Sequence, residues 1–268
     1  MNIQAVAQRT GVPAATLRKW EQRYGVLKPA RTAGLHRRYS DRDILRVEWL
    51  KARLAEGYRI GEAARLLGTV GGQAPRSPTE LVAELVEGAR AADASRIERV
   101  LDQAFALADV SQAISEVIEP ALREAGECWA AGTLSVAEEH QLSELVRARL
   151  RGLVDGWRPG TRGSAVLCCV PRERHEIGLL ALAVLLQADG WGTVYLGADT
   201  PLADAAALAG ELGATVVCVS ATIAGHAEAA EPELDELESD LAVVRGGQAF
   251  GGKPAVAAVA ELRQAVAA

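Results

Sequence analysis

The sequence predicts a multidomain protein of the α and α/β classes, and three observations support this prediction. Residues 1–69 carry a helix-turn-helix pattern, residues 79–158 carry four amphipathic helical segments, and residues 159–268 alternate buried strands with helices. Alternation of this kind is typical of a doubly wound parallel sheet with right-handed crossovers. Residues 70–78 are rich in Gly, Pro and Ser and are therefore predicted to be a linker.

Charge is distributed unevenly along the 268 residues, although the net charge is −6. Residues 1–70 hold 14 Lys and Arg against 6 Asp and Glu, whereas residues 71–268 hold 15 against 29. This asymmetry predicts that the first part contacts a polyanion and that the rest does not. The sequence has no signal-peptide pattern and no apolar run long enough to cross a membrane, so we expect a cytoplasmic protein with no membrane partner.

The N-terminal part begins with two short predicted helices around a tight turn. Residues 3–9 and 14–23 have helical spacing, and residues 11–13 separate them with the sequence Gly-Val-Pro. In a helix-turn-helix the second helix enters the major groove of DNA. Here that helix presents side chains suited to phosphate and base contacts, namely Arg18, Lys19, Arg23 and Tyr24. A charged helical hairpin that binds no nucleic acid has the same pattern, so this alternative stays open on these residues alone.

The segment that follows resembles the wing of a MerR-type winged helix-turn-helix. Residues 28–39 form a basic, turn-rich stretch before another predicted helix, and the similarity runs from Thr16 to Tyr39. The resemblance implies double-stranded DNA as the partner, gripped by the wing beside the recognition helix. It adds five residues to the implied DNA contacts: Arg31, His36, Arg37, Arg38 and Tyr39. Trp20 is favoured as a core residue.

The linker sets this chain apart from ordinary MerR-type regulators, which continue into one long helix that pairs two chains. Here residues 68–78 contain glycine and proline in place of a helical pattern. We therefore expect the rest of the protein to supply the pairing of the DNA-binding heads.

The middle part of the chain is predicted to form a four-helix bundle. The first and last helices begin with capping boxes at residues 77–80 and 135–138, and Asp93 caps the second helix. The third helical run covers residues 110–129, and we expect Pro120 to interrupt it.

The C-terminal part is predicted to alternate strands and helices. The predicted strands are residues 165–170, 193–196, 215–220 and 241–245. The predicted helices are residues 175–188, residues 202–212, a short acidic helix before the last strand, and residues 254–267. We find no fifth strand after Gly247. Cys168, Cys169 and Cys218 lie in these strands outside any C-x-x-C pair, so we interpret them as core residues.

One loop of this part carries the strongest candidate for a ligand site. Glu173, His175 and Gly178 lie between a predicted buried strand and a predicted helix, where open parallel sheets usually bind ligands. If Glu173 accepts one ring N–H of His175, the other ring nitrogen is left to bind a metal. Gly178 lets a bulky ligand approach the backbone. A solvent-exposed histidine beside acidic neighbours is the alternative interpretation of this motif taken alone.

Two further strand ends make the interpretation more specific. His-x-x-Gly, Ser-x-Thr and Gly-Gly follow three predicted strands, and this combination resembles the Rossmann-like cobalamin-binding domain of methionine synthase and the corrinoid mutases. The resemblance implies that His175 is the lower axial ligand of cobalt, with Glu173 in place of the usual Asp. Hydroxyl groups that meet the displaced nucleotide tail, and glycines that leave room for it, are implied at Ser220, Thr222, Gly246 and Gly247.

The order of the three parts resembles that of the CarH/LitR-type light-dependent repressors over nearly the whole chain. In that family the bundle covers the upper face of adenosylcobalamin, and the resemblance implies this role for Trp129, Glu139 and His140. A histidine follows the tryptophan in that family, whereas this chain has Ala130. Three alternatives stay open for the upper ligand after loss of the adenosyl group: water, which we favour, His140 or Cys128.

The resemblance implies a transcriptional repressor, not an enzyme, that forms a cofactor-dependent homo-oligomer on operator DNA in the dark. We expect a tetramer that is released when light breaks the cobalt–carbon bond. One alternative is a light-insensitive sensor of cobalamin or of another tetrapyrrole. The other is a corrinoid methyl carrier, which does not explain the DNA-binding head.

Overall fold

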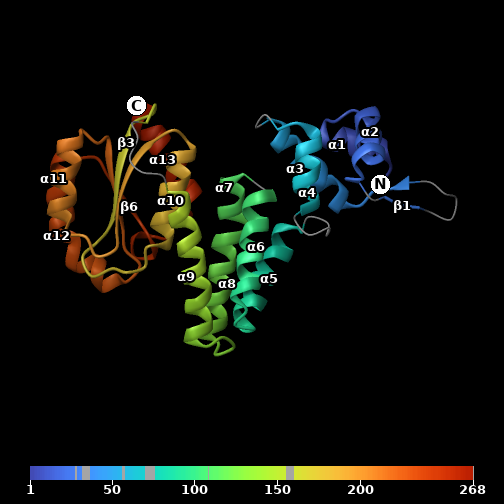
Figure 1. The fold of residues 1–268 in the computed structure, drawn as a ribbon. Helices are drawn as coiled ribbons and strands as arrows, with labels where there is room; N and C mark the ends of the chain where they lie inside the picture. Colours follow the sequence, from blue (N-terminus) through green and yellow to red (C-terminus); the bar gives the residue numbers. More distant parts are fainter. Residues whose placement is uncertain are drawn as a thin grey trace.

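The computed structural model describes the chain except residues 28, 32–36, 56–57, 70–75, 108, 155–159 and 268. Three parts follow one another along the chain: a small helical head, a helical bundle, and a sheet flanked by helices (Figure 1). Within the described ranges, none of the helices combines the length and apolar content needed to span a membrane.

The head is a helical domain with a short antiparallel hairpin. Its elements are α1 (Ile3–Thr10), α2 (Ala14–Tyr24), β1 (Ala30–Arg31), β2 (Arg37–Arg38), α3 (Asp41–Ala55) and α4 (Ile60–Thr69). Asn2 caps α1 through its side chain, and Gly11 ends this helix in the left-handed conformation that the tight turn requires. Val6, Leu17 and Leu50 are fully buried in a core formed by the head. The predicted helix-turn-helix is therefore confirmed, and β1 pairs with β2 in the segment that resembles a wing.

The helices of the bundle begin at the residues that the sequence predicts. Its elements are α5 (Pro78–Arg90), α6 (Ala94–Leu107), α7 (Val110–Gln112), η1 (Ala113–Ile118), α8 (Glu119–Ala130) and α9 (Val136–Leu153). Both capping boxes are present, at Ser77 and Ser135, where the serine hydroxyl and a glutamate side chain each accept a backbone N–H. Asp93 accepts the Arg96 N–H at the start of α6, as expected.

The third helical run differs from the prediction, because Pro120 does not interrupt it. η1 is a π-helix that joins α7 directly to α8. The Glu119 N–H donates to the Ile114 carbonyl, and this wider turn leaves Pro120 in the first turn of α8, where a missing N–H costs little. The π-turn thus accommodates the proline, and the helix continues.

The C-terminal part is an open parallel sheet. β3 (Ser164–Cys169), β4 (Gly192–Gly197), β5 (Val216–Ser220) and β6 (Val243–Gly246) have the order β4-β3-β5-β6. α10 (Ile177–Ala188) and α13 (Ala255–Ala267) cover one face, and α11 (Leu202–Leu212) and α12 (Ala224–Asp240) cover the other (Figure 1). A short 3-10 helix, η2 (Gln248–Phe250), follows β6. The doubly wound sheet is confirmed, and the described part of the chain adds no fifth strand to it.

α12 is longer than the short acidic helix predicted from the sequence. It has 17 residues and continues through Pro232. Its buried stripe is formed by Ala227, Ala230, Leu234 and Leu237, which recur every three or four residues. Packing of this stripe against the sheet therefore outweighs the helix-breaking effect of the proline.

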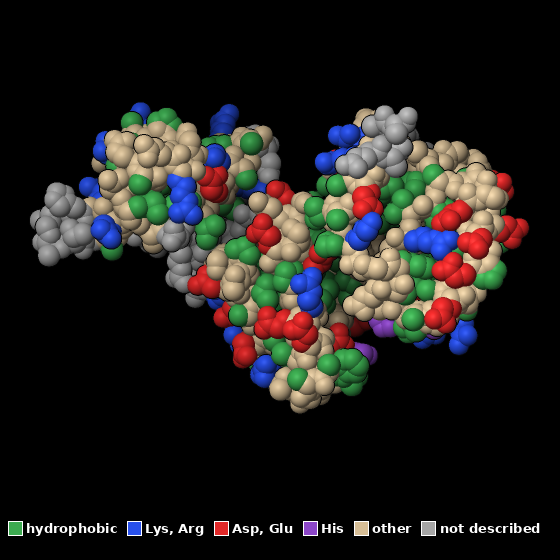
Figure 2. All heavy atoms as spheres, turned by 180° about the vertical axis from the view of Figure 1, so that it is seen from behind, with side chains coloured by type: hydrophobic (Ala, Val, Ile, Leu, Met, Phe, Trp, Pro, Cys, Tyr) green, Lys and Arg blue, Asp and Glu red, His purple; other side chains and the backbone are tan. Residues whose placement is uncertain are grey.

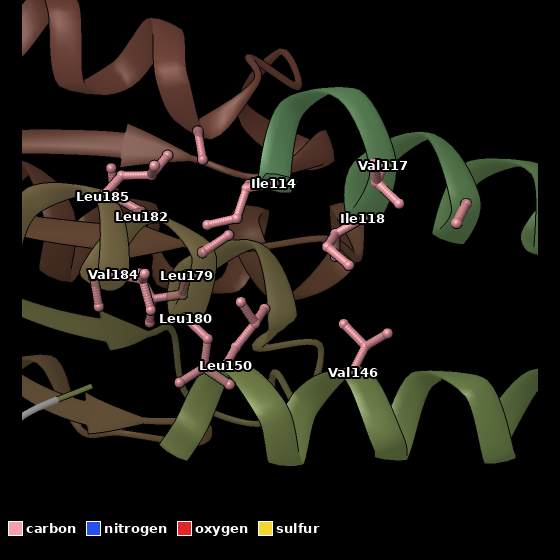
Figure 3. Packing of buried hydrophobic residues seen from close by; sticks show 14 of the residues in the cluster. Ile114, Val117, Ile118, Val146, Leu150, Leu179, Leu180, Leu182, Val184 and Leu185 are labelled. Atoms are coloured by element: carbon pink, nitrogen blue, oxygen red, sulfur yellow. The ribbon is translucent and has the colours of Figure 1, made fainter. Parts of the chain in front are cut away.

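The bundle and the sheet share one hydrophobic core. Figure 3 shows Ile114 and Ile118 of η1 and Leu150 of α9 gathered around Leu179 and Leu182 of α10. All five side chains are buried. Because apolar burial is worth roughly 25 cal/mol per Å² removed from water, this shared core fixes the bundle as a layer over α10. The bundle thereby lies next to the loop that precedes α10.

Ser135→Ala should lower the free energy of unfolding by about 1 kcal/mol, because the first turn of α9 loses its side-chain acceptor. Ser135→Asp retains an acceptor and should keep most of the stability. Urea unfolding of the cofactor-free protein, followed by circular dichroism, measures both variants. Equal losses in the two variants would contradict the capping role.

Candidate functional site

The candidate site lies at the edge of the sheet where β3, β5 and β6 end. Cys169 pairs with Ser220, and Ser220 pairs with Gly246, so the loops after the three strands start side by side. A cavity of about 240 Å³, here called the strand-end pocket, opens between them. Six residues predicted from the sequence line this pocket: His175, Gly178, Ser220, Thr222, Gly246 and Gly247. Its apolar wall comes mainly from Leu179, Leu182, Val219 and Val244.

A buried carboxylate holds the ring of His175. The His175 Nδ1 lies 2.6 Å from Glu173 Oε1, and Glu173 is fully buried, whereas the His175 side chain is 62% exposed. The hydrogen bond expected between these two side chains is therefore present. With the Nδ1 proton donated to Glu173, Nε2 keeps a lone pair for an external ligand.

Glu173 also joins two loops of the site. Its Oε1 accepts the backbone N–H of His175 at 2.9 Å, and its Oε2 accepts those of Thr222 at 2.8 Å and Ile223 at 2.9 Å. Burial alone would raise the pKa of this carboxyl group, but these N–H donors and the His175 ring lower it to about 2. The charge on Glu173 thus holds the loop after β3 against the loop after β5.

His226, in the first turn of α12, approaches the same carboxylate. Its Nδ1 lies 3.5 Å from Glu173 Oε2 and is buried with no hydrogen-bond partner among the described residues. The sequence prediction missed this residue because it lies outside the motifs at the three strand ends. A histidine placed six residues after Ser220 is the only local signal that marks it.

The glycines of the pocket serve different purposes. Gly247 has a φ of +90°, and a Cβ there would lie 2.3 Å from the Ala221 carbonyl oxygen. Close packing of two loops therefore requires this glycine. A Cβ at Gly178 would meet nothing within 4 Å, and one at Gly246 would approach only the Val219 carbonyl oxygen, at 4.0 Å. These two positions leave open space in the pocket.

The three bundle residues implied by the resemblance are not in the lining of the strand-end pocket. Trp129 lies in the last turn of α8 and is 51% exposed, so it is not a core residue. Glu139 and His140 lie near the start of α9, with His140 Nδ1 2.7 Å from Glu139 Oε2. Figure 2 shows a hollow between the bundle and the sheet domain with histidine side chains at its edge. Ala130 is exposed beside Trp129.

A polar network that the sequence did not predict links α9 to the loop of His175. Glu176 Oε1 accepts a hydrogen bond from Arg147 at 3.3 Å, and Glu176 Oε2 accepts one from the Tyr195 hydroxyl at 2.9 Å. The Arg151 guanidinium lies 4.7 Å from the centre of the Tyr195 ring. Burial and the hydrogen bond to Glu176 raise the pKa of Tyr195, so the phenol stays a donor. Members of this network come from three elements, and no sequence spacing marks them.

The donors of the site suit a metal held in a macrocycle better than a bare metal ion. No group of three or more His, Cys, Asp and Glu side chains that could hold a metal is found within the described ranges. A corrinoid supplies most of the nitrogen ligands of its metal itself and would need one donor from the protein, which Nε2 of His175 would provide. An apolar pocket with the hydroxyls of Ser220 and Thr222 suits a nucleotide tail. The residues present therefore fit a cobalamin.

The head exposes most of the predicted DNA-contact residues. The predicted contact residues with exposed side chains on α2 and the wing are Arg18, Lys19, Arg23, Arg37 and Arg38. Arg37 Nε donates to Glu21 Oε1 at 2.8 Å, which ties the wing to α2. Tyr24 is half-buried, with the Arg23 guanidinium 5.7 Å from its ring centre. His36 and the side chain of Arg31 lie outside the described residues.

Tyr39 does not have the DNA-contact role predicted for it. It is only 3% exposed and belongs to the core of the head. Its hydroxyl donates to Glu21 Oε2 at 2.7 Å, and burial followed by this hydrogen bond raises its pKa. Tyr39 therefore braces α2 and the wing from inside. Trp20 is buried, as predicted.

Comparison with protein families identifies two parts of the chain. Residues 1–69 match the MerR HTH family of regulatory proteins. Residues 81–153 match a family described as a B12 binding domain. The second match covers the bundle from α5 to α9 and not the sheet.

Two known repressors of Myxococcus xanthus are similar to most of the chain. The HTH-type transcriptional repressor CarH is 35% identical over 256 residues, which cover 91% of this chain and 83% of CarH. The HTH-type transcriptional repressor CarA is 37% identical over 209 residues, which cover 76% of this chain and 70% of CarA. Among solved structures, the monomethylamine corrinoid protein of Methanosarcina barkeri matches 70% of this chain and all of its own, with a TM-score of 0.58. At 15% identity, that likeness concerns the fold alone.

Glu173 should make the stability of the cofactor-free protein depend on acidic pH. Its folded pKa of about 2 lies below the usual 4.5, so its stabilising effect is present above about pH 4.5 and is lost as the pH falls toward 2. The contribution is at most about 3 kcal/mol. Glu173→Gln should therefore lower the free energy of unfolding at pH 7 and flatten its decline in acid.

Urea unfolding at a series of pH values measures this effect. Glu98→Gln, which changes an exposed carboxylate on α6, is the matched control and should leave the curve unchanged. A Glu173→Gln curve parallel to that of the wild type would contradict the assignment.

Proposed function

Because this chain belongs to the CarH and CarA family of transcriptional repressors, we propose that it is a light-responsive member that binds adenosylcobalamin. Its similarity to both repressors and its two family matches make it a MerR-type, cobalamin-binding transcriptional repressor. The observation that carries the proposal is the His175–Glu173 pair in the strand-end pocket of a chain that also has a DNA-binding head.

In this proposal, His175 would bind the cobalt of the cofactor through Nε2, and Glu173 would keep the Nδ1 proton in place. Adenosylcobalamin, when bound, supplies a cobalt–carbon bond that light cleaves. The strand-end pocket takes the nucleotide tail, and the Ser220 and Thr222 hydroxyls offer it hydrogen bonds. The open space beside Gly178 supports close approach of a bulky ligand to the backbone.

The upper face of the cofactor is assigned to Trp129, Glu139 and His140. Trp129 leaves about half of its surface in water, and an indole gains free energy when a ligand covers such surface. Glu139 is held by the Ser143 hydroxyl, which donates to its Oε1 at 2.5 Å. Ala130 has no donor atom, so this position offers no imidazole once the adenosyl group has left.

Regulation in this proposal acts through assembly. A single module of the size of this head makes a small interface with DNA. A cofactor-dependent homo-oligomer, proposed to be a tetramer, holds several heads together and raises their effective concentration at an operator. Residues 70–78 are the proposed linker that lets each head reach its own site.

Illumination should disassemble the loaded protein. We expect monomeric apoprotein, an oligomer in the dark with adenosylcobalamin, and smaller species after green light, because contacts from the adenosyl group to the bundle are lost. Size-exclusion chromatography with light scattering measures all three states. A dark oligomer that survives illumination would identify a light-insensitive sensor. A stable oligomer of the apoprotein would show that assembly does not depend on the cofactor.

His175→Ala is the control for the same experiment. The alanine has no lone pair for cobalt, so this variant should lose tight binding or leave the benzimidazole of the cofactor on cobalt. The visible spectrum distinguishes the two results. A spectrum and an affinity like those of the wild type would remove His175 from the site.

Arg18→Ala and Arg38→Ala should each weaken binding to double-stranded DNA by about tenfold, because each removes a phosphate or base contact. For a lost phosphate contact, the slope of log affinity against log salt should fall by about 1. Fluorescence anisotropy at several salt concentrations measures both quantities. Arg123→Ala, which removes an exposed charge from α8, is the control. If both head variants kept the full affinity for DNA, the DNA-binding surface would have to lie on other residues.

A further inference from the structure

Besides the buried thiol of Cys218, three ionisable side chains line the strand-end pocket: His175, Glu119 and Lys253. His175 is assigned to the metal. The Glu119 carboxylate already accepts the backbone N–H of Ala255 at 3.1 Å, at the start of α13. Lys253 is the one lysine or arginine in the described lining, and neither the fold nor the metal explains it.

The backbone around Lys253 is built to hold it at the pocket. Gly251 and Gly252 precede it with φ values of +96° and +60°, conformations that other residues rarely adopt. The Gly252 N–H donates to the Gly247 carbonyl at 3.0 Å, so the turn is tied to the glycine loop at the end of β6. Pro254 then leads into α13. The backbone of Lys253 is therefore held beside the part of the pocket where Gly178 and Gly246 leave open space.

The present partner of Lys253 is easily exchanged. Its Nζ lies 2.7 Å from Glu261 Oε1, and these side chains are 58% and 50% exposed. An ion pair with that exposure contributes little to stability. The ammonium group can turn toward a better anion in the pocket at little cost.

The nucleotide tail of a cobalamin brings such an anion, because a phosphodiester joins it to the corrin ring. Close to the Glu119 carboxylate, that negative charge is unfavourable unless a cation offsets it. We propose that Lys253 binds the phosphodiester of the nucleotide tail and makes the strand-end pocket selective for corrinoids that carry this tail. This assignment rests on the proposed function and names the part of the cofactor that the residue recognises.

The test compares adenosylcobalamin with adenosylcobinamide, which keeps the ring, the cobalt and the adenosyl group but lacks the phosphodiester and the nucleotide. Lys253→Ala should weaken adenosylcobalamin binding about tenfold, the size expected for one charge-assisted hydrogen bond. Adenosylcobinamide binding should be unchanged. Lys253→Arg should restore most of the loss, and added salt should weaken wild-type binding more than that of the alanine variant. Spectral titration under dim red light measures every affinity.

Lys51→Ala is the matched control, since Lys51 is a similarly exposed lysine on α3 that pairs with Glu48 at 2.9 Å. It should bind both corrinoids as the wild type does. An equal loss for the two corrinoids in Lys253→Ala, or no loss for either, would overturn the phosphodiester assignment. Failure of the wild type to bind either corrinoid would instead overturn the proposed function, and the assignment with it.

Discussion

The candidate site depends on one buried charge, the carboxylate of Glu173. A carboxylate is stable away from water only when its oxygens are hydrogen-bonded. Here three backbone N–H groups and the ring of His175 satisfy them. The same bonds orient the ring of His175 and hold the loop after β5. One carboxylate therefore determines both the position of the histidine and the position of that loop. Removing this charge therefore affects the fold as well as the site.

The bundle is joined to this site by two different kinds of contact. The first contact is the apolar core between η1, α9 and α10. Because hydrophobic contact is non-directional, this core opposes separation of the bundle from α10 more than it opposes sliding of the bundle along α10. The second contact is directional. It is the hydrogen-bonded network of Arg147, Glu176 and Tyr195, which links α9 to the loop that carries His175. Glu176 follows His175 directly in the chain. The helix whose first turns carry Glu139 and His140 thus contacts the residue that follows His175.

Local signals predicted those parts of the fold that local chemistry determines. Capping boxes located the starts of α5 and α9, and motifs at three strand ends met in one pocket because parallel strands share a carboxyl edge. The predictions failed where contacts between segments distant in the sequence determine the structure.

Tyr39 has basic neighbours in the sequence, yet it is buried, and its hydroxyl donates a hydrogen bond to Glu21 on α2. Pro120 is accommodated by a π-turn, which no sequence pattern marks. The length of α12 was underestimated because Pro232 interrupts the sequence of this helix, although its apolar residues keep helical spacing on both sides of the proline. Lys253 and Glu119 reach the pocket from segments far apart in the sequence, so no motif joins them.

The separate core of the head limits how a signal from the site can reach DNA. In the described part of the chain, the buried cluster of the head shares no member with that of the bundle. Trp49 Nε1 donates to the Ala106 carbonyl in the last turn of α6 and joins the two parts. One such bond contributes about 1 kcal/mol, whereas driving a two-state head from 1:99 to 99:1 requires about 5.5 kcal/mol. The proposed control by assembly avoids this difficulty, since linking heads strengthens binding through effective concentration and needs no change within a head. A head with its own core is the form that this proposed control favours.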